Sequence, residues 1–550
     1  MSRSIVVCAI CSMLFLKGTG QSTTDYQNDL RFLQETVHKK YANLFYRISA
    51  ADWDKQVDSL YDRIPKLGKY EVLAGLIRLV ALFHVGHTQL STHELFDSTS
   101  GTPLSLFPYR LYAFPDGLYI SKTADRYAKA LGAKVLRIGN MTSDQALDAI
   151  KPLVSFENDE GFLSNGPFYL AIPQLMMAKG IINGDDKVII RYLKNGKEDT
   201  IQYDATHEPR NHEMTGLETS AGWSAARKSD NTPLWQKNPN DYRYMEYLPE
   251  SKILYVRHSV TLDDGEKTIA GFFQNMEDFI DKHDVDKLVL DIRMNDGGNN
   301  YLNKPIITRI IASRKINQKG KFFCIIGRRT FSAAQNLTNE LEKYTEVTFV
   351  GEPTSENVNF YGDTRTETFP ASKLSVRLSW MWWQNMDPRD KRMATNPALA
   401  VDMSYNDFFN NIDPAMQVIE NAKAEANIDD QLKGFLDNGN YDAAFKTASE
   451  YLENPLHKYT RADLERRINT FGYILMGENK MEEANQTFRV NTQLFPNSAN
   501  AYDSFAECFM RMGKKDEAIK YYQMAIAKDT TGVTAENSKN MIMKIKGDAN

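Results

Sequence analysis

Three groups of residues in this chain have the types and the order that nucleophilic catalysis requires. Ser332 stands in a Thr-Phe-Ser-Ala-Ala segment, His87 lies far upstream in His-Thr, and Gly297 and Gly298 follow an apolar run. A serine hydroxyl becomes a nucleophile when an imidazole takes its proton. Paired glycines let the backbone turn sharply and leave N–H groups that can face a ligand. Together these residue types could perform acyl transfer.

Ser332 has two interpretations that its local sequence leaves open. Apolar residues recur at helical spacing after it, at Ala334, Leu337, Leu341 and Tyr344, so a helix is predicted to start here. With Gln335 three positions on, Ser332 fits a capping box, and spacing alone favours this use. As a nucleophile, its hydroxyl would be exposed at the turn and the Ala333 N–H would lie in the positive field of the helix start.

His87 is the candidate general base. A strongly apolar helix predicted over residues 70–82 leads into Phe-His-Val-Gly-His-Thr, which places His84 and His87 just past its end. Imidazole titrates near neutral pH, so it can take a serine proton and return it to a leaving amine. Two alternatives remain: a metal-binding pair of His84 and His87, without a Cys, Asp or Glu nearby to complete it, and a hydrogen-bonded structural histidine.

The elements that must position these residues are predicted to form an α/β core. Apolar runs at 252–256, 288–293, 322–326 and 347–350 predict buried strands, and a helix is expected over about 265–283. Glycine-containing turns follow the second, third and fourth runs. Residues 207–250 are polar and predict a linker or a loop packed over the site. Residues 379–383 predict a strand with Trp380, Trp382 and Trp383, which either line a cleft or pack in a core.

Residues 104–206 predict a smaller separate module. Strands are expected near 118–120 and 133–139, a capped helix over 143–150, and a hairpin over 187–203 with Asn195-Gly196 at its turn. The Val-Leu-Arg-Ile-Gly-Asn segment followed by that helix resembles a PDZ-like domain. Such domains bind peptides by adding a strand to their sheet. A long insertion separates the helix from the hairpin, between 155 and 182.

Three motifs in order resemble the tail-specific (C-terminal processing) serine peptidases of the S41 family. They are Asp-Ile-Arg-x-Asn-x-Gly-Gly from Asp291, Gly-x-x-Thr-Phe-Ser-Ala-Ala from Gly327, and Val-Gly-Glu-x-Thr from Val350. The resemblance covers most of residues 30–420. It implies a crotonase-like (ClpP/crotonase) core, Ser332 as nucleophile, and an oxyanion hole from the Gly297-Gly298 loop and the N–H of Ala333.

The chain departs from this family at three positions. Asn357 occupies the place of the usual lysine and cannot accept a proton at neutral pH, which excludes a Ser–Lys dyad under this alignment. Gly86 occupies the serine position of the tricorn-like arrangement, and Val85 replaces an Asp in the motif that ends at His87-Thr88. The late acid of that arrangement falls just before Pro397. The resemblance therefore implies the catalytic set Ser332, His87 and Asp390, with Asp387 as the other candidate acid and Glu352 in a structural role.

The two ends of the chain predict different modules. Residues 1–20 have the form of a secretory signal peptide, so the mature protein is expected to be exported, periplasmic or extracellular. Residues 21–103 predict helices. Residues 426–550 predict helices with a 34-residue period that relates Ala484 to Ala518 and Phe488 to Tyr522, with Gly472 and Ala506 in the same register. This period resembles tetratricopeptide (TPR) repeats, which bind proteins; a generic helical bundle is the alternative.

Composition limits the remaining classes. The chain has 550 residues, 42% of them hydrophobic, and a formal net charge of −5, which provides no basic surface for nucleic acid. No stretch after the N-terminus approaches the ~20 apolar residues that a membrane helix needs. No cofactor or metal is expected. The predicted fold class is a multidomain α/β protein: N-terminal helices (21–103), PDZ-like module (104–206), peptidase core (207–425) and TPR-like repeats (426–550).

Two function classes follow from the sequence. The first is an exported serine peptidase that acts on extended peptides or protein tails. The second is a non-catalytic protein of the same fold, which binds a peptide or apolar ligand and presents partners on its repeats. The intact segments around Ser332 and His87 favour the first class, whereas the missing lysine at Asn357 and the unclear match of the acid favour the second.

Overall fold

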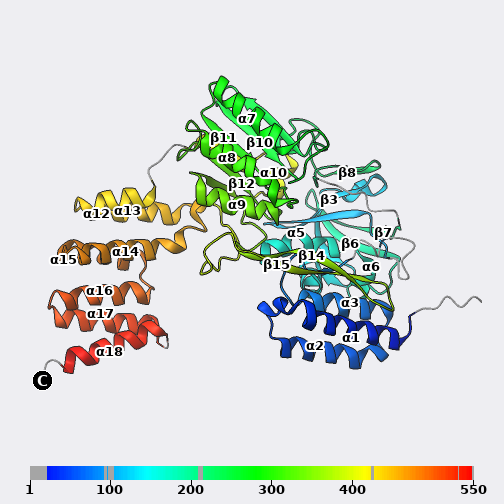
Figure 1. Ribbon diagram of the computed structural model, residues 1–550, viewed down its shortest axis with the longest axis horizontal. Coiled ribbons are helices and arrows are strands. Elements are labelled where there is room, and N and C mark those ends of the chain that lie inside the picture. Colours follow the sequence, from blue (N-terminus) through cyan, green and yellow to red (C-terminus); the bar gives the residue numbers. More distant parts are fainter. Residues whose placement is uncertain are drawn as a thin grey trace, which may run out of the picture.

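The computed structural model describes residues 21–91, 96, 104–207, 215–422, 427–530 and 532–547 (Figure 1). The predicted signal peptide, residues 1–20, lies outside the described residues. Within the described ranges, no helix is both long enough and apolar enough to cross a membrane.

The N-terminal region is helical, as predicted. Its helices are α1 (Thr23–Lys40), α2 (Ala50–Arg63) and α3 (Lys69–Ala81). Helix α3 is apolar on most of its surface and is largely buried, so it fixes the start of the segment that carries His87. Directly after that segment, the short strand β1 (Gln89–Leu90) pairs antiparallel with β15 (Ser375–Trp383). This pairing joins the N-terminal region to a part of the chain almost 300 residues away.

The second module is an antiparallel sheet with the strand order β2-β3-β4-β6-β7. Its strands are β2 (Tyr109–Phe114), β3 (Gly117–Ala124), β4 (Lys134–Ile138), β6 (Lys187–Lys194) and β7 (Lys197–Asp204). The predicted helix is α4 (Ser143–Ile150), and the insertion forms α5 (Asp159–Tyr169) and α6 (Pro173–Ala178). The PDZ-like assignment of this module stays a prediction.

The polar segment after this module is not a simple linker. Strand β8 (Trp223–Ala225) pairs with β3 of the module, and β9 (Arg243–Leu248) pairs antiparallel with the first core strand. Sequence reasoning missed β9 because it is an edge strand whose side chains after Arg243 are only partly buried, so it carries no apolar run. The segment therefore ties the module to the core sheet at both ends.

The core is a six-stranded sheet with the order β16-β13-β12-β11-β10-β9, parallel except for β9. Its parallel strands are β10 (Ile253–His258), β11 (Lys287–Asp291), β12 (Phe322–Ile326), β13 (Thr348–Gly351) and β16 (Leu399–Ala400). The helices are α7 (Ile269–Lys282), α8 (Lys304–Ala312) and α9 (Ala333–Tyr344). Ligands of such sheets bind beyond the carboxyl ends of the strands. Functional residues are therefore expected in the segments that follow β11, β12 and β13.

The C-terminal region is all helical, as predicted, and forms a stack separate from the core (Figure 1). After α10 (Tyr405–Phe409) and α11 (Pro414–Asn421), its helices are α12 (Ile428–Asp437), α13 (Tyr441–Glu453), α14 (Leu464–Gly477), α15 (Met481–Leu494), α16 (Ala499–Arg511), α17 (Lys515–Lys528) and α18 (Val533–Gly547). The proposed period comprises Gly472, Ala484, Phe488, Ala506, Ala518 and Tyr522, and all six are buried. The TPR-like assignment stays a prediction.

Gly472 gives a test of how closely these helices pack. A Cβ atom at this position would lie 2.5 Å from the Phe488 ring, whereas one at Gly477, in the same helix, would meet no atom within 4 Å. We expect Gly472→Val to destabilise the helical region by about 1–3 kcal/mol because it overpacks a filled interface. Gly477→Val carries the same β-branched cost without the clash and serves as control. Thermal unfolding followed by circular dichroism measures both; equal shifts in Tm would contradict the packing.

Candidate active site

Ser332 lies at the turn between β12 and α9, with its backbone in the left-handed region at φ 56° and ψ −123°. It occupies the N-cap position of α9, but its side chain makes no capping hydrogen bond. The hydroxyl lies 2.9 Å from Nε2 of His87 instead. Gln335 directs its amide to Asn339 and Thr395. The capping-box interpretation of Ser332 is therefore wrong, and the turn presents the hydroxyl to an imidazole.

His87 is held in place from both faces and through its neighbour. Its ring stacks against Phe331 at 4.4 Å and lies parallel to Phe360 at 5.9 Å between centroids. The buried hydroxyl of Thr88 accepts a hydrogen bond from the Ser379 N–H at 3.0 Å. Gly86 passes so close to Phe331 that a Cβ atom would lie 2.9 Å from the ring. The imidazole therefore has little freedom to turn away from Ser332.

The metal-binding alternative for His84 and His87 gains no support. His84 has a positive φ of 51° and lines a cavity beside the site, whereas His87 faces Ser332. Across the described ranges, no group of three or more His, Cys, Asp or Glu side chains could hold a metal ion.

Glu356, and not the predicted Asp390, is the carboxylate that contacts His87. Its Oε1 lies 3.0 Å from Nδ1 of His87, and its Oε2 accepts a hydrogen bond from the Ser332 N–H at 2.6 Å. The side chain is fully buried. Neither Nδ1 nor Oε1 makes a hydrogen bond of good angle, so this contact is a close approach of the two groups rather than a linear hydrogen bond. Ser332, His87 and Glu356 thus stand in the order of a serine–histidine–acid triad.

Asp390 does not reach this triad. Its carboxylate accepts hydrogen bonds from the Arg392 guanidinium at 2.8–3.1 Å, and Arg392 also pairs with Glu342. Asp390 was predicted because the late acid of the tricorn-like arrangement falls just before Pro397. This chain places its acid at a different position. Glu356 lies earlier in the chain, beside the Asn357 that had drawn attention as a missing lysine. No local pattern marks Glu356, because only burial and its two contacts distinguish it from a loop glutamate.

The loop after β11 provides backbone N–H groups next to Ser332. A Cβ atom at Gly297 would lie 2.6 Å from the Ser332 Cβ and 2.9 Å from the Ala333 nitrogen, so only glycine allows this approach. The Gly297 N–H is already donated to Oδ1 of Asn295 at 2.8 Å. Within the described chain, no hydrogen-bond partner is found for the N–H groups of Gly298 and Ala333. These two are accordingly the stronger candidates for binding an oxyanion.

The insertion of the second module holds the loop that carries Glu356. Oε2 of the buried Glu157 accepts a hydrogen bond from the Asn357 N–H at 3.1 Å. The Asn158 side chain donates to the carbonyls of Thr354 and Met393, at 3.1 and 2.6 Å. The turn before α5 therefore packs directly behind the acid. The module is part of the site and not only an appended domain.

Burial dominates the electrostatics of these groups. It lowers the pKa of His87 to about 4, so the imidazole is neutral and can accept a proton at neutral pH. Burial raises the pKa of Glu356, and the hydrogen bond from the Ser332 N–H opposes that rise. Burial and the neighbouring Glu356 raise the pKa of Glu157 to about 8. Glu157 is accordingly protonated at neutral pH.

Glu352, for which a structural role was expected, lies apart from these groups. Its carboxylate pairs with Arg328, which also donates to the carbonyl of Ala113 at 2.7 Å. The pair connects the segment before Ser332 to strand β2 of the second module.

Solved structures share this architecture at low sequence identity. A mutant of CPAF superposes with a TM-score of 0.53 at 10% identity, over 74% of this chain and 99% of that one. Mature CPAF complexed with lactacystin gives a TM-score of 0.50 at 11% identity, over 70% and 95%. The chain has an S41-like peptidase fold. The photosystem II D1 C-terminal processing protease matches this peptidase fold more weakly, with a TM-score of 0.35 at 12% identity over 68% and 93%. No protein-family model and no curated protein matches the chain.

Replacing the acid tests the triad geometry. We expect Glu356→Gln to slow the labelling of Ser332 by a fluorophosphonate probe roughly 10³- to 10⁴-fold, because an amide no longer stabilises the imidazolium. The second-order rate constant of labelling is the measurement. Asp390→Asn is the matched control and should change the rate less than about threefold, since Asp390 does not contact His87. Equal losses in the two variants would sink the assignment of Glu356.

Glu157 predicts a pH dependence of stability. Its pKa in the folded protein, about 8, lies above its ordinary value, so its contribution is fully present below about pH 4.5 and is lost as the pH rises through 8. We expect Glu157→Gln to remove this loss, so that the difference in Tm between variant and wild type moves in favour of the variant from pH 6 to pH 9. Asp159→Asn, an exposed carboxyl nearby, should give a constant difference. A constant difference for Glu157→Gln as well would contradict the shift.

Proposed function

We propose that this chain is a serine peptidase that hydrolyses peptide bonds through an acyl-enzyme on Ser332. The observation that carries the proposal is the 2.9 Å contact between the Ser332 hydroxyl and Nε2 of His87. That contact joins residues 245 positions apart, at the carboxyl edge of a parallel sheet. A capping serine or a structural histidine needs no such partner. The shared fold with S41-like peptidases supports the same reaction class.

The chemistry follows from the positions of these groups. Ser332 Oγ attacks the carbonyl carbon while its proton passes to Nε2 of His87, and the N–H groups of Gly298 and Ala333 bind the negative oxygen. Collapse of the intermediate breaks the C–N bond, and His87 returns the proton to the leaving amine. Water then repeats the sequence on the acyl-enzyme. Glu356 stabilises the imidazolium that forms in each half-reaction.

The proposal also covers the substrate, the partner and the location of the protein. The substrate is an extended peptide or a protein tail, and the second module, if PDZ-like, would bind part of it by strand addition. The C-terminal helices, if TPR-like, would present a protein partner. The predicted signal peptide places the mature protein in the periplasm or outside the cell. The alternative function is that of a non-catalytic protein of this fold, which binds a peptide or apolar ligand and presents partners on its repeats.

A single substitution tests the proposed peptidase against the non-catalytic alternative. We expect a fluorophosphonate probe to label the wild-type protein at one site and not to label Ser332→Ala. The rate at which a substrate peptide is hydrolysed should fall roughly 10⁴-fold or more in the variant. Peptide binding should stay nearly unchanged, because the hydroxyl acts mainly in the transition state. Absence of labelling in a folded wild-type protein would reject the peptidase and favour the alternative.

A further inference from the structure

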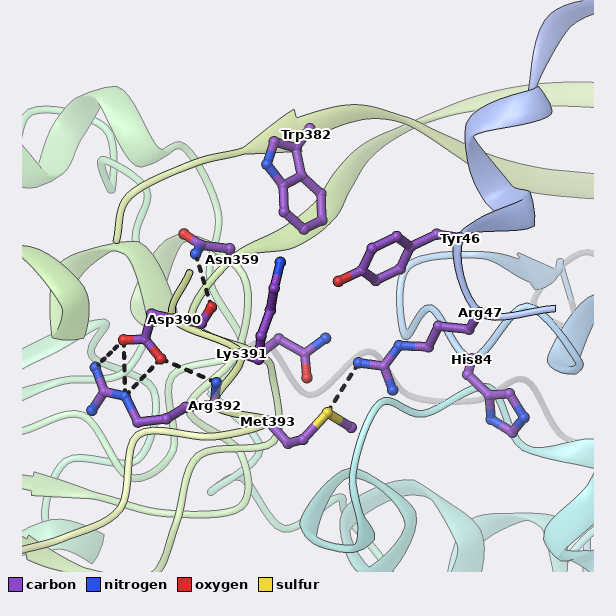
Figure 2. Close-up of a pocket in the computed structure, with 10 residues that line it drawn as sticks. Tyr46, Arg47, His84, Asn359, Trp382, Asp390, Lys391, Arg392 and Met393 are labelled. Carbon is purple, nitrogen blue, oxygen red and sulfur yellow. Dashed lines mark hydrogen bonds and ion pairs between the residues drawn. The ribbon is translucent and has the colours of Figure 1, made fainter. Parts of the chain in front are cut away.

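A cavity of about 710 Å³ lies beside the triad and has no part in the bond-breaking steps above (Figure 2). Its walls come from the N-terminal region, the segment after Glu356, strand β15 and the segment around Lys391. The cavity is therefore built by two of the chain's modules, the N-terminal region and the core. Figure 2 shows Lys391 extending toward the space between the rings of Tyr46 and Trp382.

The cavity is within reach of a peptide held at Ser332. Asn357 and Asn359 line it, while Glu356 and Phe360, on the same short segment, contact His87. Consecutive Cα atoms lie about 3.8 Å apart, so the Cα of Asn359 is at most about 11 Å from that of Glu356. An extended peptide covers this length with roughly three to four residues.

The charges lining the cavity are unbalanced. Arg392 and Asp390 neutralise each other, and Arg392 also pairs with Glu342. Arg47 and Lys391 make no ion pair within 4.0 Å among the residues that the structure describes. The Arg47 guanidinium donates to the Glu157 carbonyl at 3.4 Å and contacts the Met393 sulfur at 3.1 Å, and neither is an anion.

The nearest acids do not supply the missing charge. Burial keeps the neighbouring Glu157 carboxyl protonated near neutral pH, with its pKa at about 8. The exposed end of Lys391 has no acid of its own within ion-pair distance in the described chain. Two cations without an acid of their own thus line one cavity.

The other walls suit a peptide rather than a simple ion. The rings of Tyr46 and Trp382 approach to 5.5 Å between centroids, and Tyr46 is about half exposed, at 48%. Oδ1 of Asn357 is buried without a hydrogen-bond partner, although the side chain lines the cavity. A buried acceptor without a donor is costly, and a peptide N–H would satisfy it. Aromatic walls, an unused acceptor and two cations together define a site for a carboxylate-bearing peptide segment.

We propose that this cavity is a specificity subsite that binds a carboxylate of the peptide substrate through Arg47 and Lys391. The inference rests on the proposed function, because it names a substrate feature of the same site. The carboxylate comes from an Asp or Glu side chain or from the end of the peptide, and both present the same chemistry to the two cations.

The binding experiment uses full-length Ser332→Ala, so that it does not depend on turnover. The probes are two pools of fluorescent, N-acetylated and C-amidated decapeptides that are randomised over non-acidic residues except for one fixed Glu or one fixed Gln. We expect the Glu pool to bind about tenfold more tightly, because hydrogen bonds to charged groups contribute that much. A third pool without acidic residues and with a free terminal carboxylate identifies the source of the anion.

Substitutions of Lys391 test whether the preference for the Glu pool arises in this cavity. Lys391 is exposed and its side chain bridges no other part of the fold, so Lys391→Gln should fold normally and reduce the preference for Glu to below about threefold. Lys391→Glu should reverse it. Lys66→Gln, at another exposed lysine, is the control and should leave it unchanged. Equal binding of all the pools, or a preference that survives in Lys391→Gln, would overturn the proposal.

Turnover separates this proposal from the peptidase itself. Wild-type protein is incubated with the same pools, and cleavage is followed by mass spectrometry. Cleavage without a preference for a carboxylate would overturn the subsite and leave the peptidase standing. Binding of the acidic pools that depends on Lys391, with no cleavage by the wild-type protein, would support the subsite and reject the peptidase.

Discussion

A single buried carboxylate organises the site. Glu356 accepts a hydrogen bond from the backbone of Ser332 with one oxygen and approaches the His87 ring with the other. Since it contacts both, it sets the distance between a turn after β12 and a segment that enters from the N-terminal helices. A carboxylate without exposure to water is costly, and contacts of this kind are what reduce the cost. The rest of the fold is arranged to keep this side chain in place.

Three parts of the chain meet around Glu356, and each arrives by a different route. The parallel order of β11, β12 and β13 brings the Gly297 loop, Ser332 and the Glu356 loop to the same edge of the core sheet. The pairing of β1 with β15 delivers His87. The insertion of the second module closes the site from behind through Glu157. A change in any of these contacts would therefore shift the Ser332 hydroxyl relative to His87.

The charges at this centre divide into two kinds. Burial keeps the His87 ring uncharged and the Glu157 carboxyl protonated at neutral pH. Arg47 and Lys391, by contrast, line a cavity that opens beside the triad and find no acid of their own among the described residues. Positive charge beside the triad would favour the binding of an acidic peptide.

The amino-acid pattern was enough to predict four of the core strands and to name Ser332 and His87 as candidates. Apolar runs located β10 to β13, because buried parallel strands need unbroken apolar stretches, and α4 was predicted at Ser143–Ile150, its bounds in the structure. The motifs around Ser332 and His87 were sufficient to name both side chains. Glu356 was beyond such reasoning. Its identity depends on burial and on two contacts, one of them with a residue 269 positions away, which spacing along the chain does not encode. Asp390 and the cap at Ser332 failed for the same reason: spacing alone does not say which partner a side chain meets in the folded chain, and only the tertiary structure decided that.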